Sequence, residues 1–451
     1  MTLQYTVREV AEMMHAAPPA EGGEALVTGV STDTRSIGHG DLFIALAGEN
    51  YDADIFVDEA FAKGAVAAVT HRAHGAGPCM IVEKPLEALQ RMATAHKERH
   101  AARVIAITGS CGKTTAKDMT AAVLGSAFPV VKSKGNLNND IGCPLSLLGI
   151  ASDTRFAVIE MGANHVGEIA ALCRIARPVE SAVTMVGPAH LEGFGGMEGV
   201  AKAKGEIMEG LPQDGCFYVN MDDPYCRDMG QRYAGEKVRF GREGDIVLQS
   251  IISADDGDMI LNIAPVGRLR LPLKVKAHAW NVLLAVAVGV RHNIEDLETP
   301  LRQACQSAAR FSELRIGDLI ILDDSYNANP ASMAAAIETL KDYDGKKKIA
   351  VLGAMFELGD AAAQLHRELG ELIAQSGIDC LIARGPNSTD MVDGARAEGL
   401  AESYVYDTIE ATAAMVRRIA GPGDVVLVKG SRGMRMEDVI TTLRGACEPD
   451  A

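Results

Sequence analysis

The sequence has few aromatic side chains: phenylalanine, tyrosine and tryptophan together make up 4% of its 451 residues, with a single tryptophan. Aromatic side chains are the platforms on which single-stranded nucleic acids stack, so their scarcity argues against a nucleic-acid binder. The formal net charge of −16 argues the same way, because nucleic-acid-binding proteins present a basic surface. We therefore expect no nucleic-acid partner.

The sequence also lacks a CxxC pair and any Cys/His spacing typical of a metal site, although it contains nine cysteines. Scattered cysteines in odd number are typical of reduced thiols in an intracellular protein. Residues 1–11 are polar and charged, without the apolar segment of a secretion signal. No run approaches the roughly 18 uncharged apolar residues of a transmembrane helix. We expect a cytoplasmic protein with no membrane span.

The stretch that says most about function is residues 103–115, Arg-Val-Ile-Ala-Ile-Thr-Gly-Ser-Cys-Gly-Lys-Thr-Thr. Its apolar run predicts a buried strand of a parallel sheet. Gly109 and Gly112 then enclose a tight loop, and a helix is expected to begin at Lys113 and to end near Gly125. A strand, a glycine loop and a helix N-terminus together form a phosphate-binding site, because backbone N–H groups and the helix dipole converge on the anion.

Two side chains of this loop have defined roles in such a site. Lys113 would neutralise the β- and γ-phosphates of a nucleotide, and the Thr114 hydroxyl would bind Mg²⁺. The usual motif has a glycine five residues before Gly112, where this sequence has Ile107, so the loop is shorter than the standard one. The alternative, a glycine turn before an ordinary helix, is disfavoured because Gly-Lys-Thr-Thr lies between an apolar strand and a helix.

Pattern changes along the chain predict three units, in keeping with its length. Residues 1–84 form a small α/β unit without a phosphate loop. Residues 85–311 form the central unit, which opens with a connecting helix at 85–102, and residues 312–451 form a Rossmann-type unit without the Gly-x-Gly-x-x-Gly motif. Alternating helices and strands predict doubly wound parallel sheets. Residues 237–275, with short strands and Gly/Asp turns, predict an antiparallel flap.

Side chains capable of binding a cation follow the strands of the central unit. Glu160 ends one predicted strand, and His190 lies shortly after the next. Ligands of open α/β sheets bind beyond the carboxyl ends of the strands, where a carboxylate oxygen and an imidazole nitrogen can both hold a cation. In isolation the glutamate would be a helix cap and the histidine a surface residue. Beside a phosphate loop, the metal-binding interpretation is favoured.

With these residues assembled, the sequence resembles the Mur ligases, the ATP-dependent amide-forming enzymes of peptidoglycan synthesis. The resemblance covers nearly the whole chain. It implies an α/β fold with three domains: a small N-terminal α/β domain that binds the UDP-linked substrate, a central P-loop ATPase domain with a parallel sheet, and a C-terminal Rossmann-like domain. The nucleotide-binding residues that it implies are Thr108, Gly109, Ser110, Cys111, Gly112, Lys113, Thr114, Thr115, Asn281, Arg310 and Asp324.

The resemblance also implies the metal chemistry and the cofactors, ATP and Mg²⁺. Thr114, Glu160 and His190 would bind magnesium. A lysine fourteen residues after the histidine, carbamylated in the family, would bridge a second magnesium. By this spacing and the following Lys-x-x-Ile pattern it matches Lys204 rather than Lys202. Lys113, Glu160, His190 and Lys204 are thus the expected catalytic residues. From the residue pattern alone, Lys204 would be a solvated lysine, or one paired with Glu206.

The chain departs from the family at some nucleotide-contacting positions. The adenine-contacting pattern His-Asn-x-x-Asn reads Trp-Asn-Val-Leu-Leu at residues 280–284, so only Asn281 carries over. Arg310 matches the arginine that precedes the C-terminal domain, but it lacks the usual neighbouring proline and glycine. Ala354 stands where the family usually has an aspartate.

Within the family, Asp-Asp-Ser-Tyr-Asn-Ala-Asn-Pro at residues 323–330 most resembles the members that join D-alanyl-D-alanine to UDP-N-acetylmuramoyl-tripeptide. The stretches at 135–139, 352–359 and 428–432 agree. The resemblance implies that both compounds are substrates of a monomeric enzyme, and it leaves the third residue of the tripeptide open. The substrate-contacting residues that it implies are Ser31, Asp33, Arg35, Asn138, Asn139, Tyr326, Asn327 and Asn329.

The implied reaction moves the γ-phosphate of ATP to the tripeptide carboxylate, and the dipeptide amine then attacks the acyl phosphate. One alternative is the related ligase that adds the third peptide residue, but its diamino-acid or lysine pocket motif is missing. Folylpolyglutamate synthase lacks a uridine-binding domain like residues 1–84. A non-catalytic ATP-gated binding protein is disfavoured because the phosphate loop and the candidate metal ligands are retained together.

Overall fold

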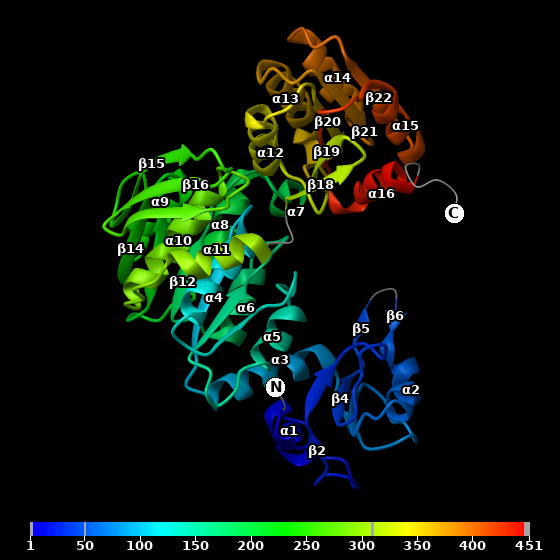
Figure 1. Ribbon diagram of the computed structural model, residues 1–451. Coiled ribbons are helices and arrows are strands. Elements are labelled where there is room, and N and C mark those ends of the chain that lie inside the picture. Colours follow the sequence, from blue (N-terminus) through cyan, green and yellow to red (C-terminus); the bar gives the residue numbers. More distant parts are fainter. Residues whose placement is uncertain (1–2, 49–50, 308–310, 446–451) are drawn as a thin grey trace.

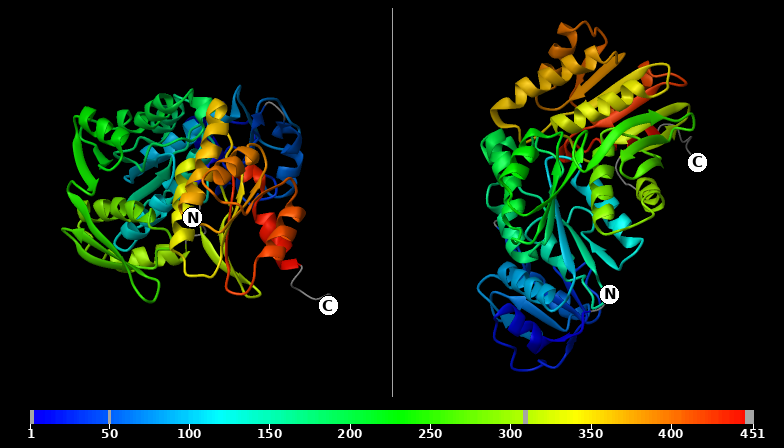
Figure 2. Two further views of the ribbon diagram at one scale, coloured as in Figure 1. Left: turned by 90° about the horizontal axis from the view of Figure 1, so that it is seen from above. Right: turned by 90° about the vertical axis from the view of Figure 1, so that its left-hand side faces the viewer.

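The computed structural model describes residues 3–48, 51–307 and 311–445. Three α/β units follow one another along the molecule, with the central unit between the N-terminal and C-terminal ones (Figure 1 and Figure 2). The α/β class is as predicted. We retain residues 84 and 311 as proposed limits of these units. No helix within the described ranges combines the length and the apolar character that crossing a membrane requires.

The N-terminal unit contains a four-stranded parallel sheet in the order β3-β4-β7-β8. A capping box between Thr6 and Glu9 starts its first helix. Its strands are β1 (Tyr5–Thr6), β2 (Leu26–Val27), β3 (Gly29–Ser31), β4 (Asp41–Ile44), β5 (Ala47–Gly48), β6 (Tyr51–Asp52), β7 (Ala67–Thr70) and β8 (Cys79–Ile81). Its helical segments are α1 (Val7–Met14), η1 (Ala53–Phe56) and α2 (Val57–Ala62).

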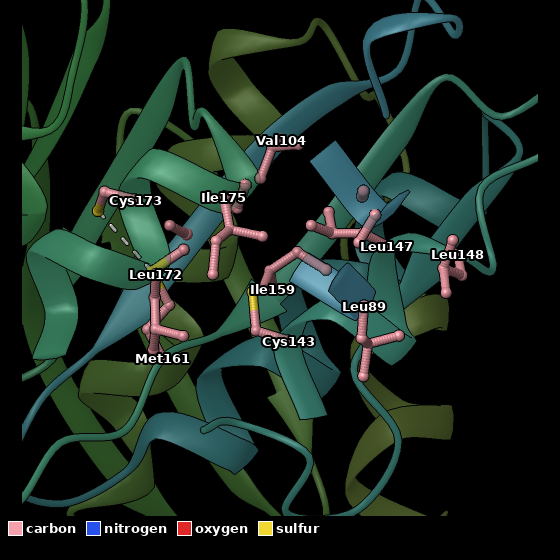
Figure 3. Close-up of a cluster of buried hydrophobic side chains, with 14 of the residues drawn as sticks. Leu89, Val104, Cys143, Leu147, Leu148, Ile159, Met161, Leu172, Cys173 and Ile175 are labelled. Carbon is pink, nitrogen blue, oxygen red and sulfur yellow. Dashed lines mark hydrogen bonds between the residues drawn. The ribbon is translucent and has the colours of Figure 1, made fainter. Parts of the chain in front are cut away.

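Helix α3 (Pro85–Glu98) joins the N-terminal unit to the central one. Its buried face, which includes Leu89 and Met92, belongs to one hydrophobic cluster that extends from α1 to the central sheet. Burial of this face keeps the two units in contact, because separating them would expose apolar area to water. Figure 3 shows Leu89 in this cluster among Val104, Cys143, Leu147, Leu148, Ile159, Met161, Leu172, Cys173 and Ile175.

The central sheet has nine strands in the order β10-β11-β9-β12-β13-β14-β15-β16-β17. The strands from β10 to β15 pair in parallel, and β15, β16 and β17 pair antiparallel. The strands are β9 (Arg103–Thr108), β10 (Val130–Lys132), β11 (Phe156–Glu160), β12 (Glu180–Val183), β13 (Cys216–Asn220), β14 (Glu236–Gly241), β15 (Ile246–Ser253), β16 (Met259–Ala264) and β17 (Gly267–Leu271).

The prediction of an antiparallel flap at 237–275 was therefore only partly right. The antiparallel hairpins exist, but β14 pairs in parallel with β13, and all four strands extend the central sheet. The physical reason is burial: Phe240, Ile246 and Leu261 pack into the same hydrophobic cluster as the centre of the sheet. A separate flap would leave these side chains in water.

Helices cover both faces of the central sheet, because alternate side chains of each strand point to opposite faces. Val104 and Ile159 pack on one face, and Ile105 and Val158 on the other. The first face is covered by α3, α5 (Gly142–Leu147), α6 (Glu168–Ala176), α8 (Met197–Glu209) and α9 (Pro224–Arg232), and the short α7 (Leu191–Phe194) precedes α8. The second face is covered by α4 (Lys113–Gly125), α10 (His278–Arg291) and α11 (Glu298–Ser307).

The C-terminal unit has a six-stranded sheet in the order β18-β19-β23-β20-β21-β22, parallel except for β18. Its strands are β18 (Ser312–Ile316), β19 (Leu319–Asp324), β20 (Lys348–Gly353), β21 (Cys380–Arg384), β22 (Ser403–Tyr406) and β23 (Val425–Lys429). One face carries α12 (Pro330–Asp342), α13 (Ala362–Gln375) and α14 (Ser388–Ala397), with η2 (Gly359–Ala361) before α13. The other carries α15 (Ile409–Ile419) and α16 (Glu437–Gly445), with η3 (Arg432–Met434) before α16.

Candidate active site

A cavity of about 710 Å³ lies between the central and C-terminal units. Its central wall comprises the residues that follow β9, β10, β11, β12 and β13, together with the start of α10. Its C-terminal wall comprises the residues that follow β19, β20 and β23. The carboxyl ends of the parallel strands of two sheets thus face one space, which is the usual ligand-binding position in open α/β sheets.

The loop after β9 depends on its two glycines. Gly109 has φ +145°, and a Cβ there would lie 2.0 Å from Thr184 Oγ1. Gly112 has φ +82°, and a Cβ there would lie 2.7 Å from Asn281 Oδ1. A side chain at either position would therefore clash, and it would also strain the backbone. The second contact shows that Asn281, at the start of α10, lies directly against the loop. This predicted nucleotide-binding residue is therefore beside the predicted phosphate site.

Helix α4 begins at Lys113, as predicted, and directs its N-terminus toward the cavity. Gly112, the residue at its N-cap, has no side chain that could compete for the backbone N–H groups of the first turn, which is the arrangement of a helix N-terminus that binds an anion. Lys113 Nζ donates to the carbonyl of Gly109 at 2.8 Å, which folds the ammonium back over the loop. The loop, the helix N-terminus and the lysine therefore have the arrangement predicted for a phosphate-binding site.

Glu160, at the end of β11, is almost completely buried, and its carboxylate is held from several sides. Oε2 accepts from Thr114 Oγ1 at 2.8 Å, and Oε1 accepts from Asn138 Nδ2 at 2.8 Å. The buried ammonium of Lys117 lies 3.8 Å from Oε2 and compensates part of the carboxylate charge. A hydroxyl and a carboxylate so close to the phosphate cradle are oxygen ligands that fit a hard divalent cation such as Mg²⁺.

His190 lies on the central wall and contacts the opposite one. Its Nδ1 meets Glu357 Oε2, and both residues adopt a left-handed backbone, with φ of 53° and 61°. Burial lowers the pKa of His190, while Glu357 acts in the opposite direction. A metal ligand needs a neutral imidazole, which a lowered pKa favours. The structure therefore places His190 in the cavity with Glu160, with Glu357 of the C-terminal unit as its partner.

Lys204 lies on α8 with only 1% of its surface exposed, so it is not the solvated lysine of the alternative interpretation. Its Nζ donates to Ala163 O at 3.4 Å and lies 5.2 Å from the centre of the Phe194 ring. Burial, with a smaller contribution from Lys113, lowers the pKa of Lys204 to about 7. A substantial fraction of the amine is then neutral near pH 7, and only the neutral amine reacts with CO₂.

Glu206, the alternative partner of Lys204, forms hydrogen bonds with backbone groups instead. Glu206 accepts from the backbone N–H groups of Gly167 and Ala170 at 2.6 and 2.9 Å, at the start of α6. No direct Lys204–Glu206 bond occurs among the described residues. Lys204 is therefore neither solvated nor bonded to Glu206, and its carbamylation stays a prediction.

The C-terminal wall carries the predicted substrate residues Tyr326, Asn327 and Asn329 together with Asp324. Asn329 accepts from Ser332 N at 2.9 Å and so caps α12, while its Nδ2 donates to Ser110 O at 3.1 Å. This one side chain therefore links the C-terminal unit to the phosphate loop. Asp324 Oδ2 pairs with the buried Lys429 at 2.6 Å.

The other predicted site residues do not line the cavity, and these include Gly109 and Lys204. Thr108 is buried and donates to Met161 O at 2.7 Å, which joins β9 to the end of β11. Ser31, Asp33 and Arg35 lie in the N-terminal unit, where Arg35 and Asp33 form an ion pair at 2.6 Å. Arg310 lies outside the described residues. The predicted residues that line the cavity are Ser110, Cys111, Gly112, Lys113, Thr114, Thr115, Asn138, Asn139, Glu160, His190, Asn281, Asp324, Tyr326, Asn327 and Asn329.

Comparison with known proteins assigns the chain to a family. Residues 26–108 match the catalytic domain of the Mur ligase family, residues 107–289 the Mur ligase middle domain, and residues 309–432 the Mur ligase glutamate ligase domain. The chain is 34% identical to the UDP-N-acetylmuramoyl-tripeptide–D-alanyl-D-alanine ligase of Bacillus subtilis, over 98% of both chains. The chain belongs to the Mur ligase family. The ligase of the same name from Escherichia coli is 36% identical over 95% of this chain and 96% of its own.

Solved Mur ligase structures share the fold. MurF from Acinetobacter baumannii superposes with a TM-score of 0.91 at 29% identity, covering 98% of this chain and 99% of that one. MurF from Thermotoga maritima, solved in complex with ADP, superposes with a TM-score of 0.81 at 29% identity, covering 93% and 98%. The three-domain Mur ligase architecture implied by the sequence is thereby confirmed.

Sequence reasoning missed several cavity residues of this Mur ligase. Glu357, Lys429 and Arg432 lie in stretches that resemble the family but were not singled out as site residues. Lys117 does not line the cavity but compensates the charge of Glu160, and it was missed because a lysine on a helix is usually solvated. A signal was available for Lys429, because a lysine that ends an apolar strand of five residues is placed at the carboxyl edge of the sheet.

Replacing Glu160 or His190 with alanine should raise the Mg²⁺ concentration that supports the half-maximal rate by about 10-fold or more. The reason is that each change removes one cation ligand while leaving the other in place. The measurement is a titration of MgCl₂ at saturating ATP. Glu192→Ala, at an exposed position two residues from His190, is the matched control and should behave like the wild type. Unchanged Mg²⁺ dependence in both cavity variants would show that the metal assignment is wrong.

Proposed function

We propose that this Mur ligase joins D-alanyl-D-alanine to UDP-N-acetylmuramoyl-tripeptide with the hydrolysis of ATP to ADP and phosphate. The names of the most similar curated relatives support these substrates. The observation that carries the proposal is the contact between Asn329 and Ser110, 3.1 Å from Nδ2 to O. It joins the C-terminal wall, where the dipeptide would bind, to the phosphate loop, so the transferred phosphate and the attacking amine can meet.

The residues of the central wall would bind and activate ATP. The loop N–H groups, the α4 N-terminus and Lys113 would hold the β- and γ-phosphates, and Asn281 lies beside them for the nucleoside. Thr114, Glu160 and His190 would hold Mg²⁺, with Lys204 as a carbamate at a second ion. Bound Mg²⁺ would neutralise the charge that develops on the transferred phosphate.

The reaction then follows from positioning and charge neutralisation. The tripeptide carboxylate attacks the γ-phosphorus, the bond to the β-phosphate oxygen breaks, and ADP leaves. The amine of the dipeptide attacks the resulting acyl phosphate, loses a proton, and displaces inorganic phosphate. Asn138, which donates to Glu160, and Asn139 lie in the cavity where the tripeptide end would enter.

The UDP end of the same substrate would lie on the N-terminal unit. We assign it to the loop of Ser31, Asp33 and Arg35, where Ser31 Oγ donates to Asp33 O and the Arg35 guanidinium is largely exposed. An exposed guanidinium suits the diphosphate of a UDP-sugar. We also propose that the enzyme works as a cytoplasmic monomer, since a single chain supplies both walls of the cavity and nucleotide-linked substrates do not cross membranes.

The test is ADP release by the purified chain with UDP-N-acetylmuramoyl-tripeptide, with and without D-alanyl-D-alanine. Release that needs both compounds and equals the amount of pentapeptide formed is the expected result. Release that needs instead UDP-N-acetylmuramoyl-dipeptide and a single diamino acid would identify the related ligase that adds the third residue. No release under any condition would favour the non-catalytic binding protein.

A further inference from the structure

The C-terminal wall of the cavity carries two cationic side chains among the described residues, Lys429 and Arg432. They differ in what they already bind. Lys429 is 2% exposed, and its Nζ donates to Asp324 Oδ2 at 2.6 Å and to Asn327 O at 2.9 Å. The side chain of Arg432 is 63% exposed. Arg432 is therefore the cation on this wall that an incoming anion can reach.

The backbone around Arg432 is fixed from several directions. Its N–H donates to Asn327 Oδ1 at 3.3 Å, and the preceding Ser431 is buried and accepts from Phe356 N at 2.9 Å. Arg432 also begins η3, which leads into α16. The side chain thus projects from an anchored point, and a guanidinium so placed loses less freedom on binding than one on a loose loop.

The guanidinium itself keeps most of its hydrogen-bonding capacity. Within the described part of the chain, its side-chain hydrogen bond is from Nη1 to Glu437 Oε1, at 2.9 Å. A guanidinium has five N–H donors in a planar fork, so this bond leaves the others for a second carboxylate. The Arg432 Cζ lies 5.9 Å from the centre of the Tyr326 ring, and Tyr326 also lines the cavity. The ring supports one face of the fork.

We propose that Arg432 and Tyr326 form a carboxylate-binding subsite that holds the C-terminal carboxylate of the incoming dipeptide. This inference rests on the proposed ligase function. The dipeptide must present its amine to the acyl phosphate at the loop, and an extended dipeptide spans about 7 Å. Its carboxylate is repelled by the ATP phosphates and by the acidic residues of the cavity. The exposed guanidinium of Arg432, on the opposite wall, supplies the charge and the bidentate geometry that a carboxylate requires.

The test compares D-alanyl-D-alanine with its C-terminal amide as acceptor, in the wild type and in Arg432→Ala. The wild type should favour the acid, and Arg432→Ala should raise the KM for the acid about 10- to 100-fold, because one charge-assisted interaction is lost. The KM for the amide should change little, so the variant should no longer distinguish the two acceptors. The KM values for ATP and for the UDP-linked substrate should remain as in the wild type.

Two further variants separate binding from structure. Arg432→Lys keeps the charge but loses the fork, and should restore part of the preference for the acid. Arg435→Ala removes an arginine three residues away that pairs with Asp438 and does not line the cavity, and should behave like the wild type. An active wild type whose preference for the acid survives in Arg432→Ala would overturn the subsite alone. A wild type that ligates neither acceptor would instead overturn the proposed function, and the dipeptide subsite with it.

Discussion

Lys113→Ala should lower the ligation rate by about 10³-fold or more without changing the fold. Lys113 is the loop cation, and its Nζ is held against the Gly109 carbonyl where the β- and γ-phosphates would lie. Its charge is needed most in the transition state, when negative charge spreads over the transferred phosphate, so kcat should fall more than the affinity for ATP. Steady-state rates at saturating substrates, with a circular dichroism spectrum of each protein, measure this.

Lys132→Ala is the control for that variant. Lys132 is an exposed lysine at the end of β10 that pairs with Asp118 at 2.7 Å and does not line the cavity. Like Lys113→Ala, the Lys132→Ala variant removes one positive charge from the central unit. It should leave the rate close to that of the wild type. Near-normal turnover of Lys113→Ala with a native spectrum would contradict the phosphate-binding role.

Lys204→Ala should be nearly inactive, with a loss of about 10²-fold or more, because it removes the proposed ligand of a second magnesium. An ammonium would repel the metal, whereas carbamylation joins CO₂ to the amine nitrogen, releases a proton and yields an anion with two oxygens. The buried position of Lys204 and its pKa of about 7 supply the neutral amine that this reaction needs. Formate or acetate should restore part of the rate of the alanine variant by placing a carboxylate in the space left.

Two companion variants make this prediction specific. Lys204→Met keeps most of the buried volume and should be as inactive as Lys204→Ala, which separates lost chemistry from lost packing. Lys202→Ala, at an exposed position of the same helix, should be mild. An inactive Lys202→Ala with a healthy Lys204→Ala would mean that the match to the family is shifted by half a turn. If both were healthy, the carbamate hypothesis would be wrong.

The parts of the molecule that sequence reasoning predicted well are those encoded locally. The strand of β9, the glycine loop and the start of α4 at Lys113 were predicted because an apolar run, two glycines and a helix start lie within 13 residues. Phe156–Glu160 was predicted for the same reason, since strand and carboxylate are contiguous. The next strand was predicted at residues 181–185, whereas β12 spans Glu180–Val183, because Glu180 is a buried charge that pairs with Arg103 from a neighbouring strand.

Features that depend on distant partners could not be predicted in this way. Whether β14 extends the sheet or forms a flap depends on the open edge of β13, which lies outside its own sequence. The His190–Glu357 contact joins residues 167 positions apart that lie in loops of different units. Arg432 can be recognised as a candidate carboxylate-binding residue only in the folded structure, where the C-terminal wall faces the phosphate loop. The predicted roles of Ser31, Asp33 and Arg35 stay predictions, because the cavity does not reach them.

The central claim is that one cavity transfers a phosphate to the tripeptide carboxylate and then exchanges it for an amine. The most direct measurement uses UDP-N-acetylmuramoyl-tripeptide labelled with ¹⁸O in its terminal carboxylate, incubated with ATP, Mg²⁺, D-alanyl-D-alanine and the purified chain. Passage through an acyl phosphate predicts that each amide bond formed leaves one ¹⁸O atom in the released inorganic phosphate, detected by mass spectrometry. Ligation that releases only unlabelled phosphate, or ADP release without any amide product, would contradict the account.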